Sequence, residues 1–230
     1  MPQTPTPSPA PAKPQPPMPP SEFQERDIAT LDAAALVGIL RDPASSEFRK
    51  AKACVRAGEL GAKEAVPALS ALLTDPHLSA YARYGLEPIS DASADDALRA
   101  ALTRLKGSFL IGLVNSIGKR RDAKASEALA KMMLGADADL ARAAAAALGN
   151  IGGAASAKEL RSALGRTTGA VKAAVADACL LGAERLLEDG KRAEALDLYA
   201  ALSGPDIPRP MRLAAMHGII REETSIGRPR

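Results

Sequence analysis

The stretch "ALGNIGGAASAKELRSALG", residues 147–165, decides the fold because it places three glycines between two apolar runs. Glycines at this density are typical of phosphate-binding loops, of low-complexity segments and of the ends of packed helices. No strand pattern precedes Gly149, as a dinucleotide-binding fingerprint requires, and no Lys-Ser or Lys-Thr pair follows at P-loop spacing. We therefore interpret the glycines as helix stops.

The residues on either side of these glycines have the spacing of amphipathic helices. One apolar stripe at helical spacing consists of Leu140, Ala144, Ala147, Leu148 and Ile151. Gly149, Gly152 and Gly153 are predicted to stop this helix, because glycine adopts the left-handed conformation readily. Ser156 and Glu159 have the spacing of a capping box for the next helix. The alanine run 143–147 is interpreted as a close-packing face.

The same arrangement recurs along the chain. Four units align on the apolar anchors Leu60, Ile89, Ile117 and Ile151, which lie 29, 28 and 34 residues apart by subtraction. Periods of this length are typical of helical-repeat arrays. We therefore expect an architecture of stacked helix pairs.

Two of these units, "TDPHLSAYARYGLEPI…ADDALRAAL" and "DADLARAAAAALGNIGGAASAKELRSAL", resemble HEAT repeats of the short type named after phycobilisome lyases. The resemblance covers roughly residues 45–165. The unit at 178–204 is more similar to a tetratricopeptide-type helix pair. The whole chain is similar to HEAT domains within larger, often exported, multidomain bacterial proteins, some of which carry c-type haem modules. This chain has no C-x-x-C-H motif, so the resemblance implies no haem site here.

The predicted fold class is all-α, a right-handed α-α solenoid of about five HEAT-like helix pairs with terminal capping helices. The caps are expected at residues 28–40 and 208–222. Residues 27–223 would form the solenoid, residues 224–230 an unstructured tail, and residues 1–26 a disordered linker. Residues 2–20 hold ten of the 18 prolines, and such a segment favours extended polyproline II structure over a core.

Composition excludes several function classes. The 230 residues are 47% hydrophobic and 3% aromatic, with no Trp and a net charge of +3, so a base-stacking nucleic-acid platform is not predicted. Cys54 and Cys179 lack metal-ligand spacing and are interpreted as small buried thiols. His77 and His217 lie too far apart in an open array to share a site. The aromatic residues Tyr81, Tyr84 and Phe109 are interpreted as core.

Enzymes built from HEAT-like repeats provide a further comparison. Deoxyhypusine hydroxylases hold iron with His-Glu pairs on successive repeats, and this sequence contains no His-Glu dipeptide. We expect no catalytic residues, no metal and no cofactor, and therefore a protein that is not an enzyme.

Charged residues supply the candidate interaction surface. The turn "GKRRDAK" is basic, and equivalent turns of a stacked array lie along one edge. The cations of these turns are Lys63, Lys119, Arg120, Arg121, Lys124, Lys191 and Arg192. Second helices line the concave face of HEAT arrays, and their exposed positions here are Asp95, Arg99, Lys131, Lys158 and Arg161. Solvated turns and faces would produce the same pattern without any ligand.

The function expected from these features is a non-catalytic scaffold that mediates protein–protein interaction. The alternatives are an accessory domain of an exported redox or hydrolytic protein, a weak nucleic-acid or anion binder that uses the basic edge, and a repeat-type lyase. We expect a protein partner and a monomeric chain, and we expect neither nucleic-acid binding nor a membrane span. The expected location is the cytoplasm, or an exported or periplasmic one if the chain is a processed piece.

Overall fold

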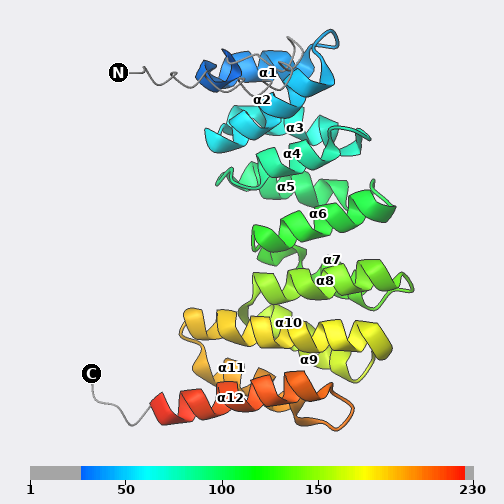
Figure 1. The fold of residues 1–230 in the computed structure, drawn as a ribbon, viewed down its shortest axis with the longest axis vertical. Coiled ribbons are helices and arrows are strands. Elements are labelled where there is room, and N and C mark those ends of the chain that lie inside the picture. Colours follow the sequence, from blue (N-terminus) through cyan, green and yellow to red (C-terminus); the bar gives the residue numbers. More distant parts are fainter. Residues whose placement is uncertain (1–26, 226–230) are drawn as a thin grey trace, which may run out of the picture.

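The computed structural model describes residues 27–225, which form a stack of helices (Figure 1). Twelve α-helices and five short 3₁₀ turns occur in this part of the chain, and it contains no strand. The predicted linker at 1–26 and the last residues of the predicted tail, 226–230, lie outside the described residues. The all-helical class predicted from the sequence is confirmed.

The helices follow one another with short connections. Their bounds are α1 Ala33–Arg41, α2 Glu47–Glu59, α3 Val66–Ala71, α4 Ser79–Leu86, α5 Ala92–Ala101, α6 Gly107–Lys119, α7 Ser126–Met133, α8 Ala138–Ile151, α9 Gly153–Leu164, α10 Gly169–Glu188, α11 Arg192–Ala200 and α12 Arg209–Ser225. The 3₁₀ turns are η2 Asp27–Thr30, η3 Lys63–Ala65, η4 Leu72–Thr74, η5 Ala123–Ala125 and η6 Ala201–Ser203.

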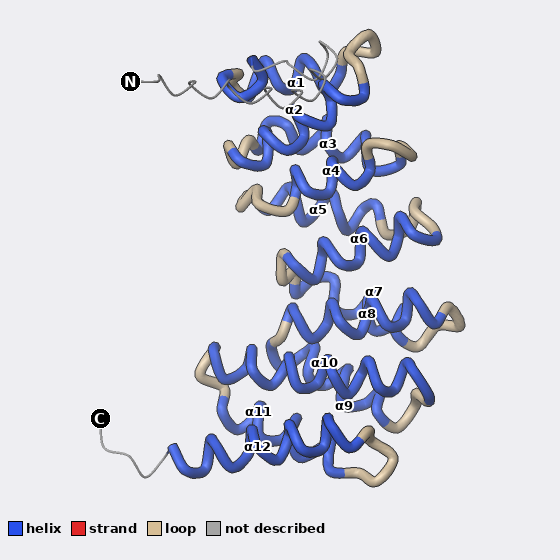
Figure 2. The backbone as a smooth tube through the Cα atoms, viewed as in Figure 1, coloured by secondary structure: helices blue, strands red, loops and turns tan. Residues whose placement is uncertain are grey.

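The helices form two layers. The first layer is continuous because α2 packs on α4, α4 on α6, α6 on α8, α8 on α10 and α10 on α12. In the second layer α3 packs on α5, α7 on α9 and α9 on α11. The turns that follow α2, α4, α6, α8 and α10 all lie on one edge of the stack, and this edge curves inward (Figure 2).

Small residues form much of the core and bring the helices close together. Of the alanine run 143–147 in α8, Ala144, Ala145 and Ala147 are buried, Ala143 is half-buried and Ala146 is exposed. The predicted close-packing face is therefore confirmed for three of its five residues. A Cβ atom on Gly149 would lie 2.8 Å from the carbonyl oxygen of Ala178 in α10. Gly149 therefore lies inside α8 at a close helix–helix contact, and its interpretation as a helix stop is wrong.

The remaining stop and start signals have mixed outcomes. Gly152 ends α8 with φ of 68° and donates its N–H to the Leu148 carbonyl, as predicted. The predicted capping box is wrong, because α9 already begins at Gly153. Ser156 is buried inside α9, and its hydroxyl lies 3.1 Å from the Ser126 hydroxyl in α7.

The predicted anchors do not all lie in the core. Ile89, Ile117 and Ile151 are buried, but Leu60 is 43% exposed. Leu60 is the residue that caps α2, so its side chain lies beyond the packed face. The core position in this unit is occupied by Ala57, which is fully buried.

Candidate functional site

Three turns on the inward-curving edge share one hydrogen-bond pattern. A backbone N–H beyond the helix end bonds the carbonyl five residues earlier, in the pairs Ala62–Ala57 after α2, Asp122–Ile117 after α6 and Lys191–Leu186 after α10. The residue before each donor has a positive φ: Gly61 at 61°, Arg121 at 56° and Gly190 at 74°. Glycine adopts this conformation freely, whereas a side chain costs about 1 kcal/mol or more. Arg121 therefore occupies a position that favours glycine.

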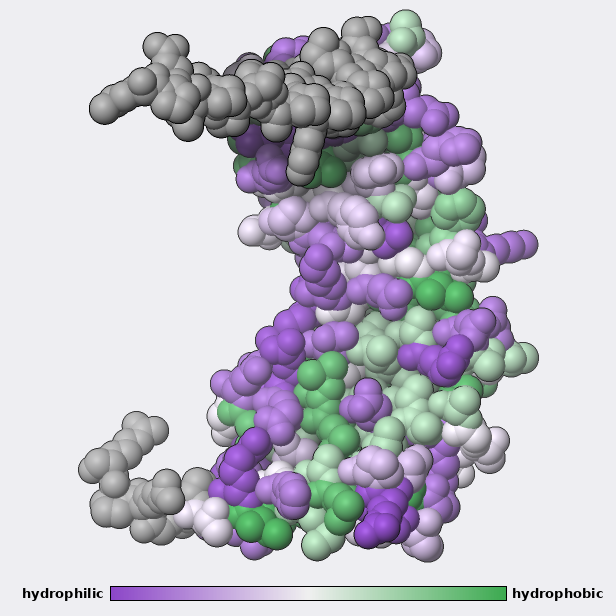
Figure 3. Space-filling view, viewed as in Figure 1, coloured by the Kyte–Doolittle hydropathy of each residue, from purple (hydrophilic) through white to green (hydrophobic). Residues whose placement is uncertain are grey.

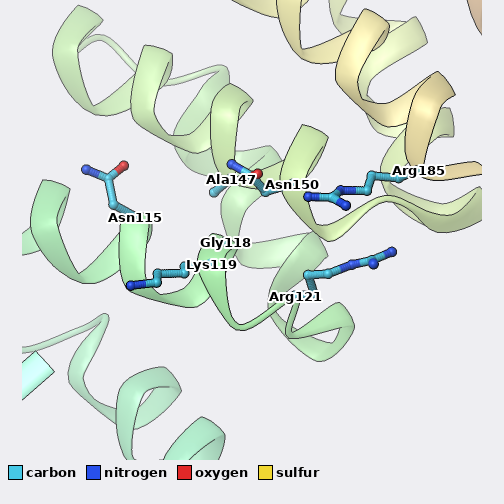
Figure 4. A pocket seen from close by; sticks show the side chains of 7 residues that line it. All are labelled: Asn115, Gly118, Lys119, Arg121, Ala147, Asn150 and Arg185. Carbon is cyan, nitrogen blue, oxygen red and sulfur yellow. The ribbon is translucent and has the colours of Figure 1, made fainter. Parts of the chain in front are cut away.

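A pocket of about 360 Å³ lies beside Arg121, at the carboxyl ends of α6, α8 and α10. It is lined by Asn115, Gly118, Lys119, Arg121, Ala147, Asn150 and Arg185 (Figure 4). Only small residues line the pocket wall between α6 and α8, because these helices approach closely. A Cβ atom on Gly118 would lie 2.7 Å from Ala147 Cα. Small residues thus form the wall, and long polar side chains reach over it.

Two arginines gather at one end of this pocket. In Figure 4 the side chains of Arg121 and Arg185 extend in opposite directions. Asn150 lies beside the Arg185 guanidinium, and Lys119 is directed away. Gly152 makes room for both arginines. A Cβ atom there would lie 2.7 Å from Arg185 Cβ and 3.5 Å from Arg121 Nη2.

The arginines use few of their N–H groups within the protein. Arg121 donates from Nε to the Ile151 carbonyl at 3.4 Å, and its Nη2 lies 3.8 Å from Asp189. Arg185 donates to Glu188 at 2.7 Å, while its Nε is buried and has no partner among the described residues. Each guanidinium carries five N–H donors in a planar fork. Most of the Nη hydrogens of the two arginines have no partner among the described residues, whereas the buried Arg185 Nε is not accessible to a ligand.

Lys119 differs from the two arginines. Its Nζ donates to Glu87 at 2.6 Å, and this hydrogen bond raises the pKa of the ammonium group. Glu87 also accepts a hydrogen bond from the buried Ser116 hydroxyl. Lys119 therefore belongs to a contact between α4 and α6 as well as to the pocket.

The other cations predicted along this edge have different surroundings. Arg120 is buried, pairs with Asp95 at 2.6 Å, and donates to the carbonyls of Leu86, Glu87 and Ile89 in the preceding unit. Arg192 donates to the carbonyl of Glu222 in α12 at 2.7 Å. The residues that remain exposed are Lys63, Lys124 and Lys191. Figure 3 shows hydrophilic residues gathered along this edge, over the ends of α6 and α8.

The residues predicted on second helices also differ in their surroundings: some form ion pairs and others line a pocket. Arg99 pairs with Asp96 and with the buried Asp122, and Lys131 pairs with Glu127 at 2.7 Å. Lys158 and Arg161 lie together instead at a smaller pocket of about 160 Å³ between α9 and α11. The other residues that line it are Ala154, Ala157, Glu194, Asp197 and Leu198.

The three aromatic residues expected in the core are on the surface. Tyr81 is 42% exposed, Tyr84 is 54% exposed and Phe109 is 36% exposed. Alanine and leucine fill the space between the helices, so these larger rings lie at its margin. The Arg83 guanidinium lies 5.6 Å from the centroid of the Tyr84 ring.

Other chemistry is sparse between Asp27 and Ser225. No group of three or more His, Cys, Asp or Glu side chains in this range is placed to hold a metal ion. Burial raises the pKa of the Cys54 and Cys179 thiols to about 12, so neither is an activated nucleophile. No helix in this range has both the length and the apolar character needed to cross a membrane.

Sequence reasoning found two of the cations at the larger pocket and missed the rest of its lining. Lys119 and Arg121 are in the predicted set, whereas Asn115, Asn150 and Arg185 are not. These residues are brought together by the stacking of three helices. One signal was available: an arginine at a turn position where related turns have Gly61 and Gly190.

Comparison with solved structures finds a likeness to human deoxyhypusine hydroxylase in complex with glycerol. The TM-score is 0.41 and the sequence identity 19%, over 84% of this chain and 74% of that chain. No protein-family model matches the sequence, and no curated protein matches it. At this level the likeness transfers neither residues nor activity to this chain.

The comparison corrects two expectations. The solved structure is that of an enzyme, which contradicts the prediction of a non-catalytic scaffold and the prediction that the chain is not an enzyme. The scaffold prediction rested on reading a stack of helical repeats as a passive binding surface. The prediction that the chain is not an enzyme rested on the lack of a His-Glu dipeptide and of other catalytic residues in the sequence. A helical-repeat architecture does not by itself decide between a scaffold and an enzyme.

Proposed function

We propose that this chain is a helical-repeat protein that binds a small oxyanion in the pocket at the carboxyl ends of α6, α8 and α10. The stack would be a right-handed α-solenoid of five HEAT-like pairs, from α2–α3 to α10–α11, with α1 and α12 as end caps. The ligand would carry a phosphate, sulfate or carboxylate group, because planar guanidinium forks bind such oxygens in pairs.

Arg121 is the observation that carries this proposal. Its φ of 56° lies in the region where glycine is favoured, and the equivalent turns contain Gly61 and Gly190. A strained conformation persists only where surrounding structure or function maintains it, and such residues cluster at ligand sites. The Arg121 side chain reaches the pocket that Arg185 also lines. Ligand binding accounts for an arginine at this costly position.

A purely structural account of these cations is helix capping. Three helices end here, and their last carbonyls carry partial negative charge that cations balance. Arg120 fulfils this role, with short bonds to three carbonyls. Arg121 makes one bond of 3.4 Å, and its side chain remains 37% exposed. Capping therefore accounts for Arg120 and leaves most of the Arg121 donors unused.

The proposal is tested by titrating the whole chain with inorganic pyrophosphate and, separately, with sulfate. Binding is followed by calorimetry and by backbone amide chemical shifts. We expect the largest shifts at Asn115, Gly118 and Asn150. Arg121→Gly should weaken binding about tenfold or more, because a charge-assisted paired hydrogen bond is lost.

Lys124→Ala provides the matched control. Lys124 is an exposed cation of the same turn and does not line the pocket. This variant should bind both anions as the unmodified chain does. Equal losses for Arg121→Gly and Lys124→Ala would show diffuse attraction to the basic edge and would overturn the proposed pocket.

A further inference from the structure

Helix α12 is apolar on two opposite faces. Its inner face packs on the stack: Ala215 is 2% exposed, and Gly218 lies so close to the Tyr199 ring that an added Cβ would be 2.6 Å from it. Its outer face has Leu213 at 45%, Met216 at 55% and Ile220 at 51% exposed. Terminal helices of repeat arrays need a polar outer face to remain unpartnered. The outer face of α12 does not have this character.

The outer residues form one regular stripe. Arg209, Leu213, Met216, Ile220 and Glu223 follow one another in alternating steps of four and three residues, the spacing of a coiled-coil seam. The stripe begins with a cation and ends with an anion. Both Arg209 and Glu223 are exposed, and neither forms an ion pair within residues 27–225.

We infer that this stripe packs against the same stripe of a second copy of the chain, with the two α12 helices antiparallel. Arg209 and Glu223 lie at equal distances along the sequence from Met216. A two-fold axis at Met216 therefore places Arg209 beside Glu223 of the partner subunit, and the reverse at the other end. A parallel pair would place like charges together. Charge complementarity thus selects the antiparallel pair.

Helix α12 lies at one end of the described stack, and no described element lies beyond it (Figure 1). Hydrophobic surface is visible at this end in Figure 3. The helix is anchored to its own chain, because Arg221 pairs with Glu184 of α10 at 3.0 Å and Arg192 of α11 donates to the Glu222 carbonyl at 2.7 Å. Docking therefore requires no rearrangement of the stack.

The expected dimer is reversible. A helix of this length is about 25 Å long, and one helix pair buries less area than the interfaces of obligate dimers. Sedimentation velocity of the whole chain, from about 1 to about 200 µM, should show monomer converting to dimer with a micromolar Kd. A chain that remains monomeric throughout this range overturns the inference.

Met216→Glu tests the interface directly. It places two carboxylates at the two-fold axis and should abolish the dimer, while circular dichroism remains unchanged because position 216 is exposed. The matched control is Val55→Glu, which adds the same charge at a 41% exposed apolar position on α2. This variant should dimerise normally. A dimer that survives Met216→Glu overturns the inference.

The antiparallel register is tested by exchanging charges. Arg209→Glu and Glu223→Arg should each weaken the dimer about tenfold, because each change creates like-charge contacts at both ends of the two-fold pair. The double variant Arg209→Glu/Glu223→Arg restores both opposite-charge contacts and should recover the original Kd. Losses that simply add in the double variant contradict the antiparallel arrangement.

Discussion

Arg120 and Arg121 are neighbours in one turn, yet they have opposite surroundings. The Arg120 side chain is 7% exposed and donates to four backbone carbonyls as well as to Asp95. The Arg121 side chain is 37% exposed and makes one hydrogen bond of 3.4 Å. The same residue type therefore serves the fold at one position and remains available for a ligand at the next.

Backbone conformation separates the two residues. Arg120 caps α6 in the right-handed helical region, and its side chain reaches back to the unit that contains Leu86. Arg121 has a positive φ, so the chain reverses there and its side chain reaches forward to Ile151. One turn thus connects the preceding unit and the following unit through adjacent arginines.

Replacing Arg120 should produce the largest change in stability. Arg120→Ala removes the hydrogen bonds that this side chain makes to four backbone carbonyls and to the Asp95 carboxylate. Breaking such a buried pair costs about 3 kcal/mol. We expect that loss in the free energy of unfolding measured by urea titration. Lys124→Ala, in the same turn, should change it by less than about 0.5 kcal/mol. Similar losses for the two variants would contradict a structural role specific to Arg120.

Closing the gap between α6 and α8 should produce an intermediate change. Gly118→Ala adds a Cβ atom 2.7 Å from Ala147 Cα and 2.8 Å from its Cβ, so the two helices must separate. Overpacking of this kind costs about 1–3 kcal/mol. Urea titration measures the loss, and anion affinity should fall as well because the pocket wall moves.

Gly38→Ala is the matched control for this substitution. Gly38 lies within α1, and a Cβ atom there would have no neighbour within 4 Å among residues 27–225 outside its own helix backbone. Removing glycine from a helix should stabilise the chain by up to about 1 kcal/mol. A Gly118→Ala variant that gains stability in the same way would show that the close approach of α6 and α8 does not limit packing.

Much of the local structure could be predicted from the sequence. Apolar spacing predicted α8, its alanine face and the stop at Gly152, because these depend on residues close together in the chain. The burial and the hydrogen-bond partners of Arg120 could not be predicted, since those partners lie 25 to 34 residues earlier in the sequence. The exposure of Tyr84 was missed for a related reason: which face of a helix is covered depends on neighbouring units.

The candidate pocket shows the same limit. Asn150 lies within residues 147–165, where it is one polar residue in an apolar run. Arg185 lies near the end of α10, in a unit with different spacing. Only the stacking of α6, α8 and α10 brings both residues to Arg121. The sequence alone therefore predicts a basic edge but does not locate a pocket on it.

The most direct test of the central claim is the thermal unfolding of Arg121→Gly, with and without pyrophosphate, beside the unmodified chain. Without ligand, glycine relieves the strain at φ of 56° and should stabilise the chain by about 0.5–1 kcal/mol, or roughly 1–4 °C in Tm. With ligand, only the unmodified chain should gain further in Tm. A variant that keeps the full pyrophosphate-induced gain in Tm would contradict the claim that Arg121 is retained to bind an anion.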